Sequence, residues 1–467
     1  MNKIISLMAT MILFVLPLTA QDNEMKYRRS SLDVVFVTNF NQWSHAHPAP
    51  EYLLKSYVLP DKYNEHSVGA RIVDLSRYPV TDNEVSALFP KYKSYLQSHE
   101  FWLSRGSHDT DGELKIDDCR IGARIDKYLK ESNIPAQLMQ KWFNQTPVKR
   151  DGSYFNMDLI LERGAYNAST LDVIRSNESV RGESILQDAG MELIPNTYIL
   201  FVASEIRTSK EVLGRASEGG MLGGDLYKMI NETSEGYYVA ARTYLYQLNW
   251  TEQDSETLFT QYWDTDDPNN VWLSIIKPTV TFLGKQQSLS EVVETDYAAL
   301  TGMLRNKIEG RNSSRSRYGG YTTQRSYNTR VTKKFNKVDL LIRATNRAID
   351  QAIVLLQKEY EDFKVKTPIA EVEGKYATAF IGLKEGVTSG AKFDILEQYY
   401  NEKNNTFKYR KAGTLKVTKD KIWDNRFNIE GLPDDSDSSS KKEDVDRTYF
   451  TGDVSKATPG MLIRQIK

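Results

Sequence analysis

NKVDLLIRATNRAIDQAIVLLQKEY, residues 336 to 360, shows the clearest helical periodicity in the chain. Asn336 is a suitable N-cap, and Asp339 lies in the first turn, where its charge complements the helix dipole. Apolar residues recur at helical spacing on one wide face: Val338, Ile342, Ile349, Ile353, Leu356 and Tyr360, with Leu341, Ala348, Ala352 and Leu355 beside them. The pattern predicts a long amphipathic helix that braces a larger structure.

The period of the hydrophobic pattern changes from helical to alternating after Thr367-Pro368. Short alternating segments follow, separated by turns: YATAFIGL (376–383), AKFDILEQYY (391–400), TFKYR (406–410), GTLKVTK (413–419) and MLIRQI (461–466). Such a series of short strands is typical of a small all-β barrel or sandwich. The sequence therefore predicts a C-terminal β module.

Two glycines in AFIGLKEGVTSGAKFDILEQY (379–399) mark a structural turn within this module. Gly386 and Gly390 permit positive φ at a tight connection. After the turn, Phe393 should face the core, whereas Lys392 and Asp394 should face water. The stretch is predicted to be a β-hairpin, and its glycines need no catalytic role.

The part of the chain before the helix alternates between helical and strand patterns. Strands are expected at 32–38, 197–206, 236–250 and 278–284, and helices at 119–144, 155–176 and 183–194, with a break at Gly164. We therefore expect an α+β protein with a main α/β-layered domain, a long bracing helix and a small barrel-like C-terminal module. The expected boundaries are 1–20 for a signal peptide, 25–305 for the main domain, 306–336 for a flexible Arg/Ser/Tyr/Gly loop, 337–364 for the amphipathic helix and 365–467 for the β module.

The first twenty residues have the pattern of a secretory signal peptide. A lysine precedes an apolar run that is shorter than the roughly 20 residues needed to span a bilayer, and cleavage is expected near Ala20. We expect an exported protein in the periplasm, at the outer membrane or at the cell surface. It should have no transmembrane helix, and peripheral contact with a membrane is compatible with this pattern. The 61 basic and 62 acidic residues nearly balance, so no nucleic-acid partner is expected.

SHDTDGELKIDD, residues 107 to 118, partly matches a calcium-binding loop. The candidate ligands are the side chains of Ser107, Asp109, Asp111, Glu113 and Asp118. Serine in the first position and aspartate in the twelfth depart from the usual pattern, so binding would be weak. The alternative is an acidic turn without an ion. We therefore expect no cofactor, and calcium is the one candidate for a bound ion.

Other groupings of reactive side chains have simpler interpretations. The five histidines, His45, His47, His66, His99 and His108, lack a metal-binding motif and are expected to form a surface cluster rather than a zinc site. The acidic residues beside Trp263 (Asp264, Asp266 and Asp267) are a candidate for polymer hydrolysis, but short acidic turns are common. No catalytic residues are assigned from the sequence.

Two segments resemble modules of bacterial envelope proteins. The long helix followed by FIGLKEGVTSGAKFDIL resembles C-terminal modules of flagellar and secretion-assembly proteins. The segment from FNMDLILERGAYNAS to VRGESILQDAGMELIPNTYILF resembles uncharacterised exported proteins of Gram-negative gut-type bacteria, with a distant similarity to curli-secretion (CsgG-like) and TolB N-terminal domains. The curli-secretion proteins are lipoproteins, whereas in this chain no cysteine stands directly after the expected cleavage site.

These resemblances imply a non-enzymatic envelope protein that binds or assembles other components. Its expected partners are other envelope proteins or further copies of itself. The alternative is a secreted or periplasmic hydrolase that acts on a polymer through acidic residues, in the 107–118 loop or near Trp263.

Overall fold

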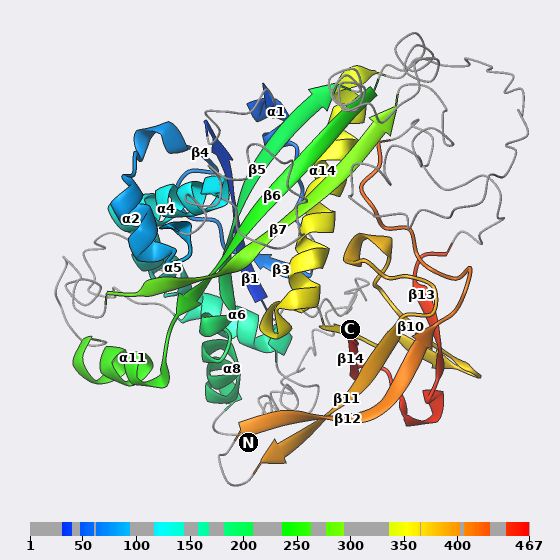
Figure 1. Ribbon diagram of the computed structural model, residues 1–467. Coiled ribbons are helices and arrows are strands. Elements are labelled where there is room, and N and C mark those ends of the chain that lie inside the picture. Colours follow the sequence, from blue (N-terminus) through cyan, green and yellow to red (C-terminus); the bar gives the residue numbers. More distant parts are fainter. Residues whose placement is uncertain are drawn as a thin grey trace, which may run out of the picture.

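The computed structural model shows an α+β protein with two β-sheets (Figure 1). It describes residues 30–39, 47–59, 62–93, 116–143, 157–167, 182–208, 236–262, 277–293, 336–364, 366–401, 406–429 and 445–466. Within these ranges, no helix combines the length and apolar character needed to cross a membrane.

Sheet A forms the centre of the main domain. Its seven strands are β1 (Ser30–Thr38), β2 (His47–Pro48), β3 (Tyr63–Glu65), β4 (Ile72–Asp74), β5 (Thr197–Thr208), β6 (Gly236–Asn249) and β7 (Thr279–Val293). The order is β3-β1-β5-β6-β7, with β4 beside β1 and β2 beside β5. β1 runs parallel to β3, β4 and β5, whereas β5, β6 and β7 are antiparallel neighbours. All four expected strands are present, and β7 is longer than predicted.

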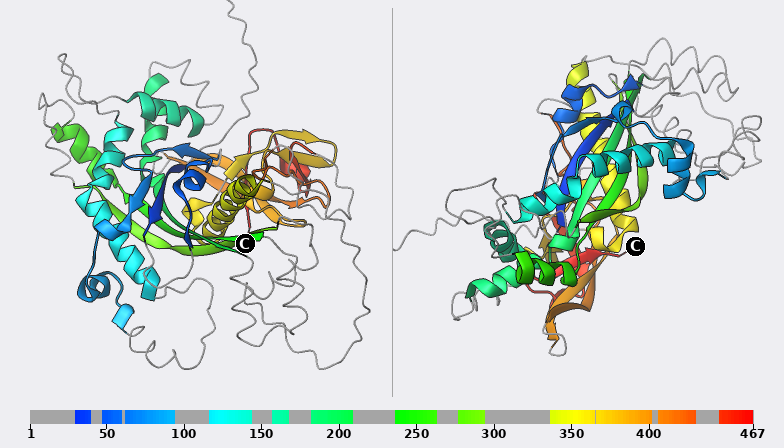
Figure 2. Two further views of the ribbon diagram at one scale, coloured as in Figure 1. Left: turned by 90° about the horizontal axis from the view of Figure 1, so that it is seen from above. Right: turned by 90° about the vertical axis from the view of Figure 1, so that its left-hand side faces the viewer.

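Helices bury both faces of sheet A (Figure 2). The helices before the last strand of this sheet are α1 (Glu51–Lys55), α2 (Asp82–Leu88), α4 (Ile116–Glu131), α5 (Ile134–Trp142), α6 (Asp158–Asn167), α8 (Gly182–Met191) and α11 (Glu252–Thr257). Phe201 of β5 packs with α4 and α5 on one face, whereas Leu200 packs with α14 (Lys337–Glu359) on the other. This double burial explains why β5 is apolar without a break from Tyr198 to Ala203.

Helices α6 and α8 cross at two glycines. A Cβ atom on Gly164 would lie 1.9 Å from the carbonyl oxygen of Leu186, and one on Gly190 would lie 2.1 Å from that of Ile160. The expected helix break at Gly164 is therefore wrong, because α6 continues through this position. Glycine is needed there so that the two backbones can come into contact.

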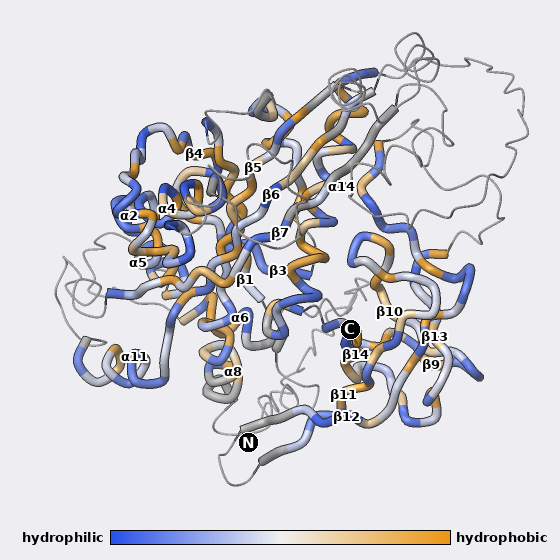
Figure 3. The backbone as a smooth tube through the Cα atoms, in the orientation of Figure 1, coloured by the Kyte–Doolittle hydropathy of each residue, from blue (hydrophilic) through white to orange (hydrophobic). Residues whose placement is uncertain are grey.

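Helix α14 confirms the predicted bracing helix. The Asn336 side chain caps it by accepting a hydrogen bond from the backbone N–H of Val338. Hydrophobic and hydrophilic segments alternate along α14 in Figure 3. Two details differ from the prediction: Val338 is exposed, and the helix buries a polar face that includes Arg343 and Asp350.

Sheet B forms the C-terminal module and confirms the expected barrel-like β structure. Its strands are β8 (Lys366–Pro368), β9 (Glu371–Glu373), β10 (Tyr376–Ala379), β11 (Lys392–Asn401), β12 (Thr406–Val417), β13 (Thr448–Gly452) and β14 (Leu462–Gln465). All neighbours are antiparallel, in the order β8-β14-β11-β12-β13-β10-β9. Its core contains Phe393, Leu415 and Phe450.

The predicted hairpin at residues 379–399 is wrong. β10 pairs with β9 and β13, whereas β11 pairs with β12 and β14, so two other strands separate β10 from β11 in the sheet. The glycine-containing segment is a crossover connection. The alternating pattern correctly indicated two strands but did not show which strands they pair with.

The two glycines of this crossover do adopt positive φ, at +73° for Gly386 and +78° for Gly390. Gly386 ends a short 3₁₀ turn, η5 (Leu383–Glu385), and a Cβ atom there would lie 2.4 Å from Cγ1 of Val354 in α14. Gly390 has more room, because its nearest neighbour would be Cε of Lys416 at 3.5 Å. Gly386 thus also permits the close contact between the crossover and α14.

Helix α14 lies between the two sheets (Figures 1 and 2). On its module side, Arg347 donates a hydrogen bond from Nε to the carbonyl oxygen of Phe427 at 3.1 Å, and Arg343 donates one to the Asn428 side chain at 3.3 Å. The helix therefore holds the β module against the main domain through polar contacts.

Candidate functional site

The best candidate for a binding surface is the outer face of sheet B, the side opposite the core of the module. Strand alternation places Lys392, Lys416, Thr418, Thr451, Tyr449, Thr378 and Tyr376 on this face, together with Asp394 and its partner Thr414. Their neighbours along the strands, such as Phe393 and Phe450, point into the core. The pairing of β11, β12, β13 and β10 brings these residues together from separate parts of the sequence.

Two lysines form the charged part of the outer face. Lys392 of β11 lies directly opposite Lys416 of β12, and the next partner across the sheet is Thr451 of β13. Both lysine side chains are exposed, and among the described residues neither has a carboxylate within ion-pair distance. Like charges at directly opposed positions destabilise a sheet. An anionic ligand would relieve this repulsion.

Two tyrosines form the aromatic part of the outer face. The rings of Tyr376 and Tyr449 meet edge to face with their centres 5.8 Å apart. The ammonium group of Lys421 lies 5.0 Å from the ring centre of Tyr449 and 5.5 Å from that of Tyr376, and Lys375 lies 5.3 Å from Tyr376. Both rings are partly exposed, so the face offers aromatic surface beside positive charge.

Among the residues that the structure describes, two threonine hydroxyls next to Tyr449 lack hydrogen-bond partners. Thr378 is directly opposite Tyr449 in the sheet and is only 6% exposed, and its Oγ1 has no partner. Thr418 donates its backbone N–H to the Tyr449 carbonyl at 2.9 Å, but its Oγ1 is also unsatisfied. Buried polar atoms are usually satisfied, so two such hydroxyls on one face favour a surface that is completed by a ligand or by ordered water.

Acidic residues limit the positive region at the β9 edge. Glu373 pairs with Tyr376 in the register, and Glu371 pairs with Thr378. Glu371 also forms an ion pair with Arg447 at 3.1 Å, and the Arg447 guanidinium lies 4.9 Å from the ring centre of Phe380. The outer face is therefore basic at Lys392 and Lys416, and of mixed charge both around Asp394, which pairs with Lys411 and Arg464, and at β9.

The residues of the predicted calcium loop fall into two groups. Ser107, Asp109, Asp111 and Glu113 lie outside the described residues. Asp118 lies in the first turn of α4 and is almost fully buried. Within the ranges that the structure describes, no three His, Cys, Asp or Glu residues are grouped as a metal site.

Asp118 is the centre of a buried charge network. Lys285 donates to its Oδ2 at 2.7 Å, and the Tyr244 hydroxyl donates to its Oδ1 at 2.9 Å. Arg242 lies 3.8 Å from the same carboxylate and also pairs with Glu205. The two carboxylates, Asp118 and Glu205, are balanced in charge by Lys285 and Arg242. A metal ion at Asp118 would have to displace Lys285.

The single cysteine has no sign of nucleophilic reactivity. Cys119 is buried in a small apolar cluster with Val85 and Tyr92. Burial raises the pKa of its thiol to about 11, and the neighbouring Asp118 acts in the same direction. The thiol is therefore protonated at neutral pH, and only the thiolate is a good nucleophile.

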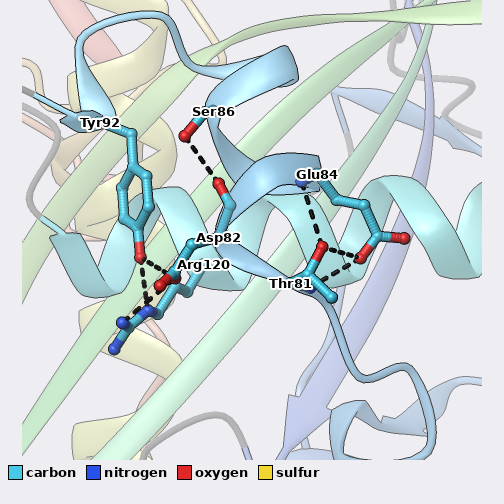
Figure 4. A network of polar contacts seen from close by, with 6 residues as sticks. All are labelled: Thr81, Asp82, Glu84, Ser86, Tyr92 and Arg120. Carbon is cyan, nitrogen blue, oxygen red and sulfur yellow. Dashed lines mark hydrogen bonds and ion pairs between the residues drawn. The ribbon is translucent and has the colours of Figure 1, made fainter.

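A polar network on the surface fixes α2 against α4 (Figure 4). Thr81 and Glu84 form a capping box at the start of α2. The Tyr92 hydroxyl donates to Asp82 at 2.7 Å and accepts from Nε of Arg120 in α4 at 2.8 Å. These contacts satisfy one another and explain the position of the helices without a ligand.

His66 contradicts the expectation of a surface histidine cluster, because its side chain is completely buried. Arg163 donates to its Nδ1 at 2.7 Å, so Nε2 carries the proton and donates to the Leu138 carbonyl at 2.9 Å. Burial and the positive charge of Arg163 lower the pKa of His66. The guanidinium of Arg163 also lies 4.4 Å from the ring centre of Trp142, so this group stabilises the core.

A small cavity of about 10 Å³ lies at the junction of β3, α14 and η5. This volume is close to what one water molecule needs. Asp350, Gln357, Lys384 and Glu385 are among its lining residues. The Asp350 carboxylate accepts a hydrogen bond from Tyr57, and burial raises its pKa to about 7. The cavity is too small for an organic ligand, and the buried Asp350 makes the junction sensitive to pH.

The fold and the outer face of sheet B define an α+β protein with an open sheet surface that carries lysine, tyrosine and threonine. No family model matches this chain, and no curated protein matches it. The pairing of Lys392 with Lys416 was not predicted from the sequence, although alternation in AKFDIL and GTLKVTK places each lysine opposite the core positions.

Proposed function

We propose that this protein is a non-enzymatic component of the cell envelope, in the periplasm or at the outer membrane, that binds or scaffolds another component through the outer face of sheet B. The supporting observation is the exposed pair Lys392 and Lys416, which face each other without an acidic partner among the described residues. The sequence patterns that imply export and an assembly role agree with this function.

The arrangement of the two sheets suits a scaffold. Helix α14 has its apolar face in the core of the main domain and its polar face against the β module. The module is therefore held in one orientation while its outer face remains on the surface. A rigidly held binding surface loses less conformational entropy on binding than a loosely tethered one.

The proposal is tested by capture of envelope components on the immobilised full chain. The test variant carries Lys392→Glu and Lys416→Glu, and the charge-matched control carries Lys93→Glu and Lys358→Glu, two exposed lysines of the main domain. We expect the wild type and the control to retain the same components and the test variant to lose them. Equal capture by all three proteins would contradict the proposal.

A further inference from the structure

We infer that the outer face of sheet B binds an acidic polysaccharide, a sugar polymer that carries carboxylate or sulfate groups. This inference rests on the proposed function and adds the chemical class of the ligand. The groups involved are the ammonium groups of Lys392 and Lys416, the rings of Tyr376 and Tyr449, and the hydroxyl of Thr378.

The positions of these groups suit a ligand that extends across the strands. Lys392, Lys416 and Thr451 are successive partners on β11, β12 and β13. The next strand is β10, where Ala377 pairs with Phe450 of β13. Tyr376, which precedes Ala377, therefore lies beside Thr451, which follows Phe450. With strands roughly 4.8 Å apart, the row from β11 to β10 extends for about 14 Å. A linear polymer can contact the whole row, whereas a small anion would contact only one end.

The chemistry of the row suits a sugar that also carries an acidic group. The two lysines provide positive charge for a carboxylate or a sulfate. The partly exposed rings of Tyr376 and Tyr449 provide apolar surface for the C–H faces of a sugar ring.

The same observations disfavour other anionic partners. A flat anionic membrane would meet Glu371 and Glu373 at the β9 edge as well as the lysines, and the repulsion would offset part of the attraction. Nucleic acid binding depends on many basic contacts along the phosphates, whereas the chain as a whole has a net charge of −1. A polysaccharide that follows the row ends at Tyr376, beside Glu373, and can place its acidic groups at the lysines.

The test measures binding of the purified full chain to defined probes. Electrophoresis in gels that contain polygalacturonate or chondroitin sulfate detects binding as retardation, with dextran as the uncharged polymer. Vesicles of phosphatidylglycerol and a single-stranded DNA oligonucleotide test the other two classes. The variants are Lys392→Glu with Lys416→Glu, Tyr449→Ala, and the control Lys93→Glu with Lys358→Glu, each checked for an unchanged far-ultraviolet circular dichroism spectrum.

We expect retardation by at least one acidic polysaccharide and none by dextran. The two substitutions to glutamate should weaken binding at least tenfold and reduce its dependence on salt, because they remove the charged contacts. Tyr449→Ala should weaken binding while the salt dependence stays as in the wild type. The control variant should bind like the wild type.

Three results would overturn the inference: no binding to either acidic polymer, equal binding by the double glutamate variant, or binding only to the vesicles or the oligonucleotide. If envelope components are still captured through Lys392 and Lys416 while both acidic polymers fail to bind, the ligand class is wrong and the proposed function stands. If capture also fails, the proposed function is wrong as well.

Discussion

The Tyr57 hydroxyl donates a hydrogen bond to Oδ1 of Asp350 at 3.1 Å and so joins the end of the segment after α1 to the middle of α14. Both side chains are buried, at the point where the main domain meets the β module. Arg347 and Lys384 stabilise the ionised form of Asp350, whereas Glu385 opposes it. Burial has the largest effect and raises the pKa of Asp350 from 3.8 to about 7.

This raised pKa makes the stability of the protein depend on pH. The folded protein holds a proton on Asp350 that the unfolded chain releases above about pH 4, so the free energy of unfolding should fall as the pH rises from about 4 to about 7. Asp33 has a pKa raised to about 7 by burial and acts in the same direction.

Asp350→Asn should remove part of this dependence and raise the melting temperature at pH 8. Thermal unfolding from pH 4 to 8, with the exposed Glu252→Gln as control, measures the effect. An identical pH dependence in Asp350→Asn and the wild type would contradict the assignment.

The buried pair of Asp118 and Lys285 should be costly to break. Lys285→Met removes the cation nearest to the buried Asp118 carboxylate and leaves Arg242, at 3.8 Å, as a more distant one, so the free energy of unfolding should fall by about 3–5 kcal/mol. Adding Asp118→Asn to Lys285→Met should restore part of the loss, because the buried carboxylate that has lost its nearest cation is then neutral. Urea unfolding measures both values. Glu397→Gln, which breaks the exposed pair with Arg410, serves as control and should have little effect. A double variant that is less stable than Lys285→Met alone would argue against this account.

Millimolar calcium should leave the melting temperature unchanged. A ligand that binds only the folded state stabilises it, but the Asp118 carboxylate already accepts hydrogen bonds from Lys285 and Tyr244. Thermal unfolding with and without calcium provides the measurement. The prediction fails if calcium raises the melting temperature and the combined substitutions Asp109→Ala and Asp111→Ala abolish that rise.

The two glycines of the crossover should differ in their tolerance of substitution. Gly390→Val forces a β-branched residue to positive φ at a cost of about 1–2 kcal/mol. Gly386→Val adds a collision with Val354 of α14 and should cost more. Lys392→Ala, on the exposed side of β11, should change stability little. Chemical unfolding gives the order, and a Gly386→Val protein as stable as the parent would show that this contact is not required.

Local sequence patterns predicted much of the fold. The periodicity of residues 337–360 gave the bracing helix and its N-cap, and the apolar runs at 32–38 and 197–206 correctly indicated buried strands. The helix pattern around Gly164 misled because glycine can mark either a break or a close crossing of two helices. Only the position of Leu186 in the folded chain distinguishes these two cases.

The site was harder to predict, because strand pairing is not local. Lys392 was correctly expected to be exposed, but its partner Lys416 is known only from the register of β11 and β12. Asp394 was expected to face water, yet it is only 9% exposed because Lys411 and Arg464 pair with it. Long-range ion pairs of this kind leave no periodic signal in the sequence.

The proposed binding of a partner to the outer face of sheet B can be tested in the cell itself. The most direct measurement is photo-crosslinking in cells with benzoylphenylalanine in place of Tyr449 on this face, and in place of Lys93 on the main domain as control. We expect a higher-mass adduct from position 449, none from position 93, and loss of the adduct when Lys392→Glu and Lys416→Glu are added. No adduct from position 449, or the same adduct from both positions, would contradict it.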